Sequence, residues 1–157
     1  MSGQTERFCG FMEEYAAFMG EMVAQEDQKY GALISNDLGR MDKAIAQQQS
    51  MLKRLEKLEE RRMTLQRELG WEGLTFTQVL DRLEGDPRRQ QLEELFAQTG
   101  RSLEQIRYSN DKSMSFARMS LQVNNLLAPE EEKPYGAHKE KTARRDEPSG
   151  TVLQTKI

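Results

Sequence analysis

The side chains that most often carry catalysis are scarce in this chain, and their spacing does not bring them together. The only histidine, His138, lies in a polar segment near the end of the sequence, and the only cysteine, Cys9, stands beside Phe8 and Phe11. Metal or redox chemistry in a helical bundle would need inward carboxylates and Glu-x-x-His pairs. A cysteine among aromatic residues is typical of a small core side chain. We therefore expect neither a metal nor a cofactor.

Nucleotide and hydrolytic chemistry also lack their usual patterns. The sequence has no phosphate-binding glycine-rich loop ahead of a helix, no Gly-x-Ser-x-Gly segment and no Cys–His pair on elements expected to be ordered. A site built from scattered polar groups would need a deep pocket in which they converge. The sequence predicts that the protein is not an enzyme.

The charged residues alternate in sign along the chain. The acidic pairs Glu59–Glu60 and Glu93–Glu94 have lysine or arginine three or four positions away. These pairs and Glu13–Glu14 are expected on solvent-exposed helix faces. Arginine pairs are interspersed with acids in the same way, at Arg61–Arg62, Arg88–Arg89 and Arg144–Arg145. The formal net charge is -3 and the pI is near 5.4. A nucleic-acid partner is not expected.

The composition favours one helical unit in the cytoplasm. Of the 157 residues, 36% are hydrophobic and 31% charged, which suits long helices that each bury one stripe. No apolar run approaches the roughly 18 to 20 residues of a membrane span. Met1 to Arg7 has no basic region leading into an apolar signal core. We expect a cytoplasmic protein without membrane insertion.

Two long helices are predicted in the first half of the chain, over residues 5–33 and 37–69, because apolar residues recur there every three or four positions. The first stripe comprises Phe8, Phe11, Tyr15, Phe18 and Met22, and the second Leu38, Met41, Ile45, Leu52, Leu55, Leu58, Leu65 and Leu69. Asn36 and Asp37 are expected as N-cap and first-turn acid, and Gly70 as the C′ residue. The short connection at residues 34–36 requires the two helices to be antiparallel.

A short helix and a third long helix are predicted next. The short helix, with the stripe Phe76, Val79, Leu80 and Leu83, is expected to be capped by Thr75 or Thr77 and to plug the leucine-rich end of the hairpin. Asp86 followed by Pro87 indicates the start of a helix over residues 87–127. Gly100 costs about 1 kcal/mol relative to alanine inside a helix, and whether the helix kinks there stays open.

The predicted fold is therefore all-α: an elongated antiparallel bundle of three long helices plus one short helix, formed by residues 1–128. Residues 129–157 open with Pro129-Glu130-Glu131-Glu132-Lys133-Pro134 and continue without periodicity. Their composition cannot bury enough apolar area to offset the entropy of ordering. We expect a flexible or loosely ordered polar C-terminal tail.

The third long helix has two apolar stripes in its second half. The stripe Leu92, Phe96, Leu103, Ile106 continues through small and polar residues, namely Asn110, Ser113, Ala117, Ser120 and Asn124. A second stripe, rotated by roughly 80°, comprises Phe116, Met119, Val123 and Leu126, with Met114 and Leu127 at its margins. A helix in a three-helix bundle needs one buried stripe. The second stripe either packs against the first helix or is exposed for a partner helix, which makes these six residues the candidate binding site.

Several segments carry a resemblance to a known family. Asn36-Asp37-Leu38, the run from Leu52 to Leu69 with Leu55-Glu56-Lys57-Leu58-Glu59, and the closing Glu68-Leu69-Gly70 resemble the second helix of the FlgN family of flagellar export chaperones. That family's third helix carries an Asn-x-x-Asn-x-x-Leu pattern, which appears here as Asn110-x-x-Ser113-x-x-Phe116, followed by Leu121. The second asparagine and the leucine are replaced. The resemblance covers roughly residues 5–135.

The resemblance implies a function in type III protein export. Such a chaperone binds the C-terminal helices of hook-associated proteins, which form the hook-filament junction, keeps them from assembling early, and delivers them to the flagellar export gate. Chaperones of this kind dock through a tyrosine near the C-terminal end, which would be Tyr135. The alternative is a structural coiled-coil scaffold that oligomerises through the same stripe, and sedimentation of the isolated protein would distinguish the two.

Overall fold

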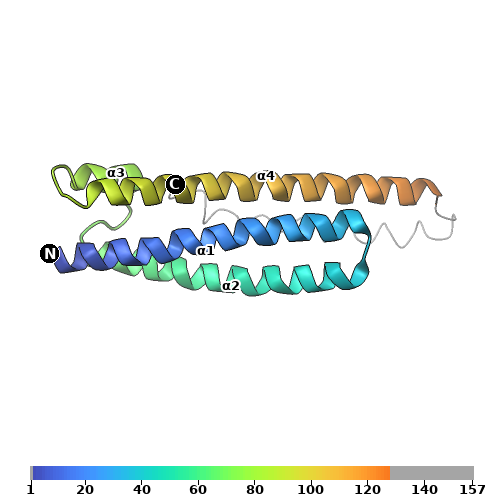
Figure 1. Ribbon diagram of the computed structural model, residues 1–157, viewed down its shortest axis with the longest axis horizontal. Helices are drawn as coiled ribbons and strands as arrows, with labels where there is room; N and C mark the ends of the chain where they lie inside the picture. Colours follow the sequence, from blue (N-terminus) through green and yellow to red (C-terminus); the bar gives the residue numbers. More distant parts are fainter. Residues whose placement is uncertain (1, 128–157) are drawn as a thin grey trace.

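The computed structural model describes residues 2–127, and this part of the chain forms four α-helices and no β-strand. The helices are α1 (Ser2–Ser35), α2 (Leu38–Glu68), α3 (Phe76–Arg82) and α4 (Arg89–Leu127). Helices α1 and α2 form an antiparallel hairpin, α4 runs along α1, and the short α3 lies beside the first turns of α4 (Figure 1). The predicted all-α bundle of three long helices and one short helix is confirmed. The predicted tail, residues 129–157, lies outside the described residues.

The turn between α1 and α2 ends one helix and caps the next. Asn36 adopts a positive φ of 57°, and its N–H donates to the Leu33 carbonyl at 3.2 Å. Asp37, rather than Asn36, is the N-cap of α2, because its carboxylate accepts a hydrogen bond from the Arg40 N–H. At the other end of α2, Gly70 has a φ of 77°, as expected for a C′ glycine.

Thr75, not Thr77, caps α3. The Thr75 side chain accepts from the Gln78 N–H, and the Gln78 side chain accepts from the Thr75 N–H in return. This reciprocal capping box stabilises a helix of only seven residues.

The predicted start of α4 at residue 87 is wrong by two residues. Asp86 caps a turn, with its carboxylate accepting from the Arg88 N–H at 2.8 Å and its carbonyl accepting from the Arg89 N–H at 3.1 Å. Pro87 therefore takes the second position of a β-turn, another position that its fixed φ favours. The helix then begins at Arg89 and continues through Gly100 to Leu127 without interruption.

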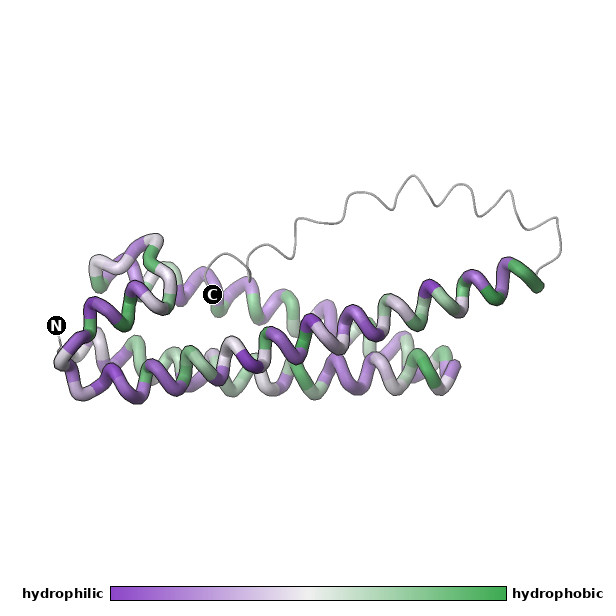
Figure 2. The backbone as a smooth tube through the Cα atoms, turned by 90° about the horizontal axis from the view of Figure 1, so that it is seen from above, coloured by the Kyte–Doolittle hydropathy of each residue, from purple (hydrophilic) through white to green (hydrophobic). Residues whose placement is uncertain are grey.

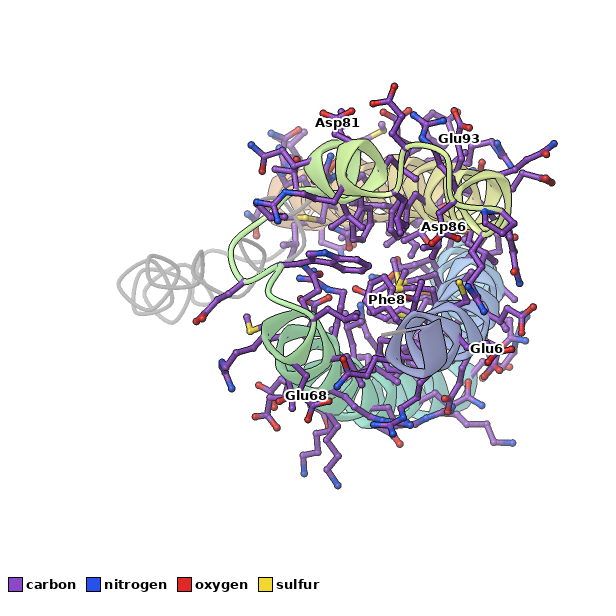
Figure 3. All side chains as sticks on the ribbon, turned by 90° about the vertical axis from the view of Figure 1, so that its left-hand side faces the viewer. Glu6, Phe8, Glu68, Asp81, Asp86 and Glu93 are labelled. Carbon is purple, nitrogen blue, oxygen red and sulfur yellow. The ribbon has the colours of Figure 1, made fainter. Side chains whose placement is uncertain are left out.

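The apolar core lies at the end of the bundle that α3 covers. Helix α1 packs against both α2 and α4. The Phe8 ring lies in the centre of the end view (Figure 3), in edge contact with Trp71 at 5.5 Å and Phe96 at 6.4 Å between ring centroids. Phe76 of α3 stacks on Phe96 at 4.0 Å. Helix α3 lies at the end of the bundle that the sequence predicted, but it packs chiefly on α4 and contacts the hairpin through Phe76, whose ring centre lies 5.5 Å from the Arg62 guanidinium.

The opposite end of the bundle has a smaller and more polar core. Its buried residues include Gln25, Glu26, Ala44, Ser109 and Ser113. Helix α4 extends past the turn between α1 and α2 in both views (Figures 1 and 2). Residues 121–127 are exposed without exception, because neither α1 nor α2 is long enough to cover them.

Candidate functional site

Half of the large apolar side chains that are exposed in the described part of the chain lie on the last 14 residues of α4. Leu126 and Leu127 are 85% and 79% exposed, and Met119 is 61% exposed. Leu121, Met114 and Val123 are also exposed. Apolar side chains gathered at one end of a small protein are typical of a surface that binds another protein.

The six residues predicted as a binding site do not form one surface. Phe116, Met119 and Val123 line a hollow of about 460 Å³ together with residues at the turn between α1 and α2, including Leu33, Ile34 and Met41. We call this hollow the tip groove. Phe116 is half-buried, and its ring packs edge-on against Tyr30 with 6.3 Å between centroids. The second stripe thus lies partly against α1 and is partly exposed.

Met114 lines an adjoining hollow of about 160 Å³ that we call the side groove, which shares Leu33, Met41 and Ala117 with the tip groove. Its lining comes from three helices: Lys29 and Leu33 of α1, Met41 and Ile45 of α2, and Ser113, Met114 and Ala117 of α4. Met114 and Phe116 are two residues apart, which on a helix means a rotation of roughly 200°. Leu126 and Leu127 line neither groove.

Polar contacts join the three long helices beside the grooves. The Lys29 ammonium contacts the Glu26 carboxylate and the Asn110 side-chain oxygen, each at 3.0 Å. Gln48 of α2 donates to Glu26 at 3.1 Å, and Ser109 donates to Asp27 at 3.1 Å. Of the small and polar residues predicted to continue the first stripe of α4, Ser113 is buried, Asn110, Ala117 and Ser120 are half-buried, and Asn124 is exposed. The buried Ser109 was not part of that prediction.

A second polar cluster lies in the apolar end of the bundle and corrects two predictions. Glu59 and Arg62 were expected on solvated helix faces, yet they are 5% and 1% exposed. The Arg62 guanidinium donates to both carboxylate oxygens of Glu59, at 2.8 and 3.1 Å, and Tyr15 of α1 donates its hydroxyl proton to the same carboxylate. These residues are buried because α1 and the segment before α3 cover this face of α2.

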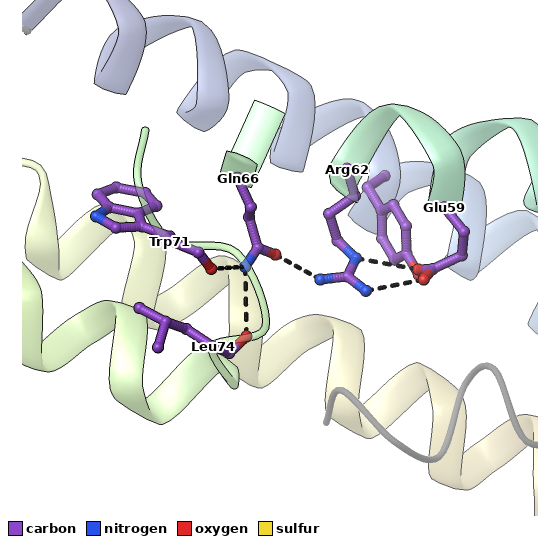
Figure 4. Close-up of polar contacts among 6 residues, drawn as sticks. Glu59, Arg62, Gln66, Trp71 and Leu74 are labelled. Carbon is purple, nitrogen blue, oxygen red and sulfur yellow. Dashed lines mark hydrogen bonds and ion pairs between the residues drawn. The ribbon is translucent and has the colours of Figure 1, made fainter. Parts of the chain in front are cut away.

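The cluster continues to the segment that leads into α3 (Figure 4). Arg62 also donates to the Gln66 side-chain oxygen, and the Gln66 side-chain nitrogen donates to the carbonyls of Trp71 and Leu74 at 3.1 and 3.3 Å. Burial, followed by the neighbouring Glu59 charge, raises the pKa of Tyr15 well above its usual value. The phenol therefore stays protonated, and the cluster fixes the position of α3 relative to α1 and α2.

The remaining side chains of possible chemical interest pack in the core or lie apart. Cys9 is buried, as predicted, and burial raises the pKa of its thiol. Among residues 2–127, no three histidine, cysteine or acidic side chains are grouped so that they could hold a metal ion. None of the helices in this region has an apolar stretch long enough to cross a membrane. The only histidine, His138, and Tyr135 lie outside the described residues.

The arrangement is suited to holding an amphipathic helix, since two apolar grooves flank the end of α4. The sequence-based prediction named residues of α4 alone and did not include the hairpin residues that line the grooves, chiefly Leu33, Met41 and Ile45. The available signal for Met41 and Ile45 was their place in the apolar stripe of α2.

One comparison with known proteins gave a match. The model of the family described as FlgN protein matches residues 1–128. No curated protein and no solved structure matches the chain.

Proposed function

Because the chain belongs to the FlgN family of flagellar export chaperones, we propose that it binds the C-terminal helices of hook-filament junction proteins in the cytoplasm and delivers them to the export gate. The observation that carries the proposal is the apolar stripe at the end of α4, in which Met119, Val123 and Leu126 are exposed and Phe116 is half-buried beside the hairpin. An unassembled amphipathic helix aggregates through its apolar face, and a groove that covers this face prevents aggregation.

The stripe alone is too small to hold a client tightly. Fully burying four such side chains contributes about 6 to 12 kcal/mol at roughly 1.5 to 3 kcal/mol each. Association costs about 4 to 15 kcal/mol, while a micromolar complex needs a net gain of about 8 kcal/mol. Leu33, Ile34 and Met41, which line the tip groove with the stripe, would therefore have to contribute to client binding.

The site is tested by charging the stripe. Met119→Glu and Val123→Glu are made singly, and thermal unfolding is measured on the same samples as binding of a peptide spanning the C-terminal helix of a hook-filament junction protein. Both native side chains are about half exposed or more, so stability should be kept while affinity falls tenfold or more. Tyr108→Glu is the matched control, because Tyr108 is 63% exposed on the same helix and lines neither groove. Unchanged affinity in both variants, or unfolding of both, would remove the stripe as the client surface.

Docking at the export gate is proposed for Tyr135. Tyr135→Ala should leave binding of the client peptide unchanged and reduce secretion of the client by cells. Normal secretion by this variant would contradict the assignment.

A structural scaffold would use the exposed stripe differently. It would form an oligomer whose size does not change with concentration, and Met119→Glu would dissociate it. Sedimentation velocity on the unmodified protein and on this variant distinguishes a scaffold from a chaperone that binds its client transiently.

A further inference from the structure

Helix α3 shows what fits between α2 and α4 at one end of the bundle. Its Phe76 stacks on Phe96 of α4, and the Arg62 guanidinium of α2 lies 5.5 Å from the centre of the same Phe76 ring. The Arg89 side chain of α4 donates to the Leu80 carbonyl of α3 at 3.1 Å. A short amphipathic helix thus occupies the fourth corner of the bundle (Figure 3), but only for seven residues.

The row of α2 that faces this corner continues beyond α3. Ile45, Leu52, Glu59 and Gln66 recur every seven residues and form a row that turns by about 20° per repeat along the helix. Glu59 and Gln66, at the end where α3 lies, are 5% and 3% exposed. Ile45 and Leu52, further along, are 47% and 46% exposed. The two apolar residues of this row are thus half exposed at the end of α2 that α3 does not reach, whereas Glu59 and Gln66 are covered by α1 and by the segment before α3.

Helix α4 repeats the pattern. Phe96 and Met114 are 18 residues apart, as are Leu103 and Leu121, and 18 residues correspond to five full turns. Phe96 and Leu103 are buried, whereas Met114 is 50% and Leu121 is 61% exposed. Met114 and Ile45 meet across the side groove, whose floor is formed by Lys29 and Leu33 of α1. Ser113 lines the same groove, and its buried hydroxyl has no hydrogen-bond partner in the described part of the chain.

From this continuity we infer that the uncovered length between α2 and α4 is a binding slot for an amphipathic helix of the client, which completes the bundle as its fourth helix. The inference rests on the proposed chaperone function but places a client helix along the side groove instead of on the stripe. The slot extends from Leu38 to Leu52 on α2, which at 1.5 Å per residue is about 21 Å, or four turns of helix. The client helix needs apolar residues at positions i, i+3 or i+4, and i+7, the spacing found in α3.

The test compares the slot with the stripe. Ile45→Glu and Met114→Glu are made in the full chain, with Met63→Glu as a control, because Met63 is 42% exposed on α2 and lines neither groove. Affinity for the client peptide is measured by fluorescence anisotropy, and folding by circular dichroism. Both slot variants should weaken binding at least tenfold, and the control less than twofold. Ile45→Ala and Met114→Ala, which introduce no charge, should weaken it by about three- to tenfold and serve if the glutamate variants unfold.

A second measurement locates the bound helix directly. A bimane dye attached at Ile45→Cys should shift to the blue when the peptide covers it, and the same dye at Met63→Cys should not. The native Cys9 is buried and its thiol pKa is raised, so it reacts slowly with the dye.

The outcomes separate the two proposals. Binding that is lost in the stripe variants but kept in the slot variants overturns the slot and leaves the proposed function standing. If the slot variants lose affinity for the client peptide and the dye at residue 45 shifts to the blue, the slot is supported. This holds whether or not the stripe variants also lose affinity. No binding by the unmodified protein overturns both proposals. The unmodified protein could also self-associate. If Ile45→Glu abolishes that self-association and leaves the affinity for the client peptide unchanged, the slot binds a second copy of the chain, and the inference is overturned.

Discussion

Arg62→Ala should strongly destabilise the bundle, because it leaves the Glu59 carboxylate buried without its cationic partner. Arg62 is 1% exposed and donates to Glu59 and to Gln66. Removing one member of a buried ion pair costs about 3 to 5 kcal/mol, which is a large share of the roughly 5 to 15 kcal/mol that stabilises a typical domain. The variant should therefore be partly unfolded at moderate temperature.

Urea unfolding provides the measurement. Trp71, the only tryptophan, is 6% exposed and contacts Phe8, so its fluorescence reports on the end of the bundle that contains the cluster. Circular dichroism reports on all helices. Arg61→Ala is the matched control, since Arg61 pairs with Glu14 at 3.5 Å while both side chains are more than half exposed. Such a surface pair contributes about 0.2 to 1 kcal/mol, and the contact of the Arg61 guanidinium with the Phe11 ring, at 5.1 Å from the ring centre, adds about 0.5 to 1 kcal/mol.

A combined variant distinguishes a stranded charge from lost packing. Replacing the pair by Glu59→Leu and Arg62→Met removes both charges and keeps the volume, so it should recover most of the stability lost in Arg62→Ala. Tyr15→Phe is included to avoid leaving the phenol hydroxyl buried without an acceptor. The reasoning is refuted if Arg62→Ala costs no more than Arg61→Ala, or if the apolar combination is less stable than Arg62→Ala alone.

Three further predictions concern single features. The stability of the protein should fall as pH rises above about 10, because the unfolded chain releases the Tyr15 proton there while the folded chain, whose Tyr15 pKa is raised, retains it; Tyr15→Phe should reduce this slope by up to about 1.4 kcal/mol per pH unit in urea titrations. Thr75→Ala should lower the free energy of unfolding by about 1 kcal/mol through loss of the capping box, and an unchanged urea midpoint would contradict the role of the cap. Truncation at Ala128 should leave the melting temperature nearly unchanged while impairing export, and a large loss of stability would show that the tail belongs to the core.

Helical periodicity was enough to predict the four helices but not their environments. The three-four spacing of Phe8, Phe11 and Tyr15 identifies a buried face of the helix. It does not show which other helix packs against that face. Glu59 and Arg62 were misplaced because an acid and a base three residues apart look the same on a surface as in a core. A signal was nevertheless present, since Glu59 and Gln66 continue the row that begins with Ile45 and Leu52. Polar residues in an otherwise apolar row indicate either a buried polar cluster or a place where a different element packs against the helix.

The start of α4 and its second apolar face could not be predicted for different reasons. Asp86-Pro87 suits both a helix cap and a β-turn, and only the hydrogen bonds from the Arg88 and Arg89 N–H groups show which forms. The position of the second face depends on where α1 ends relative to α4. That relation is set by packing between helices that are far apart in the sequence, and periodicity within one helix carries no information about it.

The division of the bundle into two unlike ends follows from how its helices are held in register. At the end covered by α3, aromatic packing and the Glu59–Arg62 cluster fix the helices. At the other end apolar burial is limited, and contacts of Lys29 with Glu26 and Asn110 link α1 to α4 while Gln48 links α2 to Glu26. Hydrogen bonds of this kind specify register with little apolar area. These hydrogen bonds hold α2 and α4 apart, so that Ile45, Leu52, Met114 and Leu121 remain exposed. A groove that a client helix can enter requires this separation.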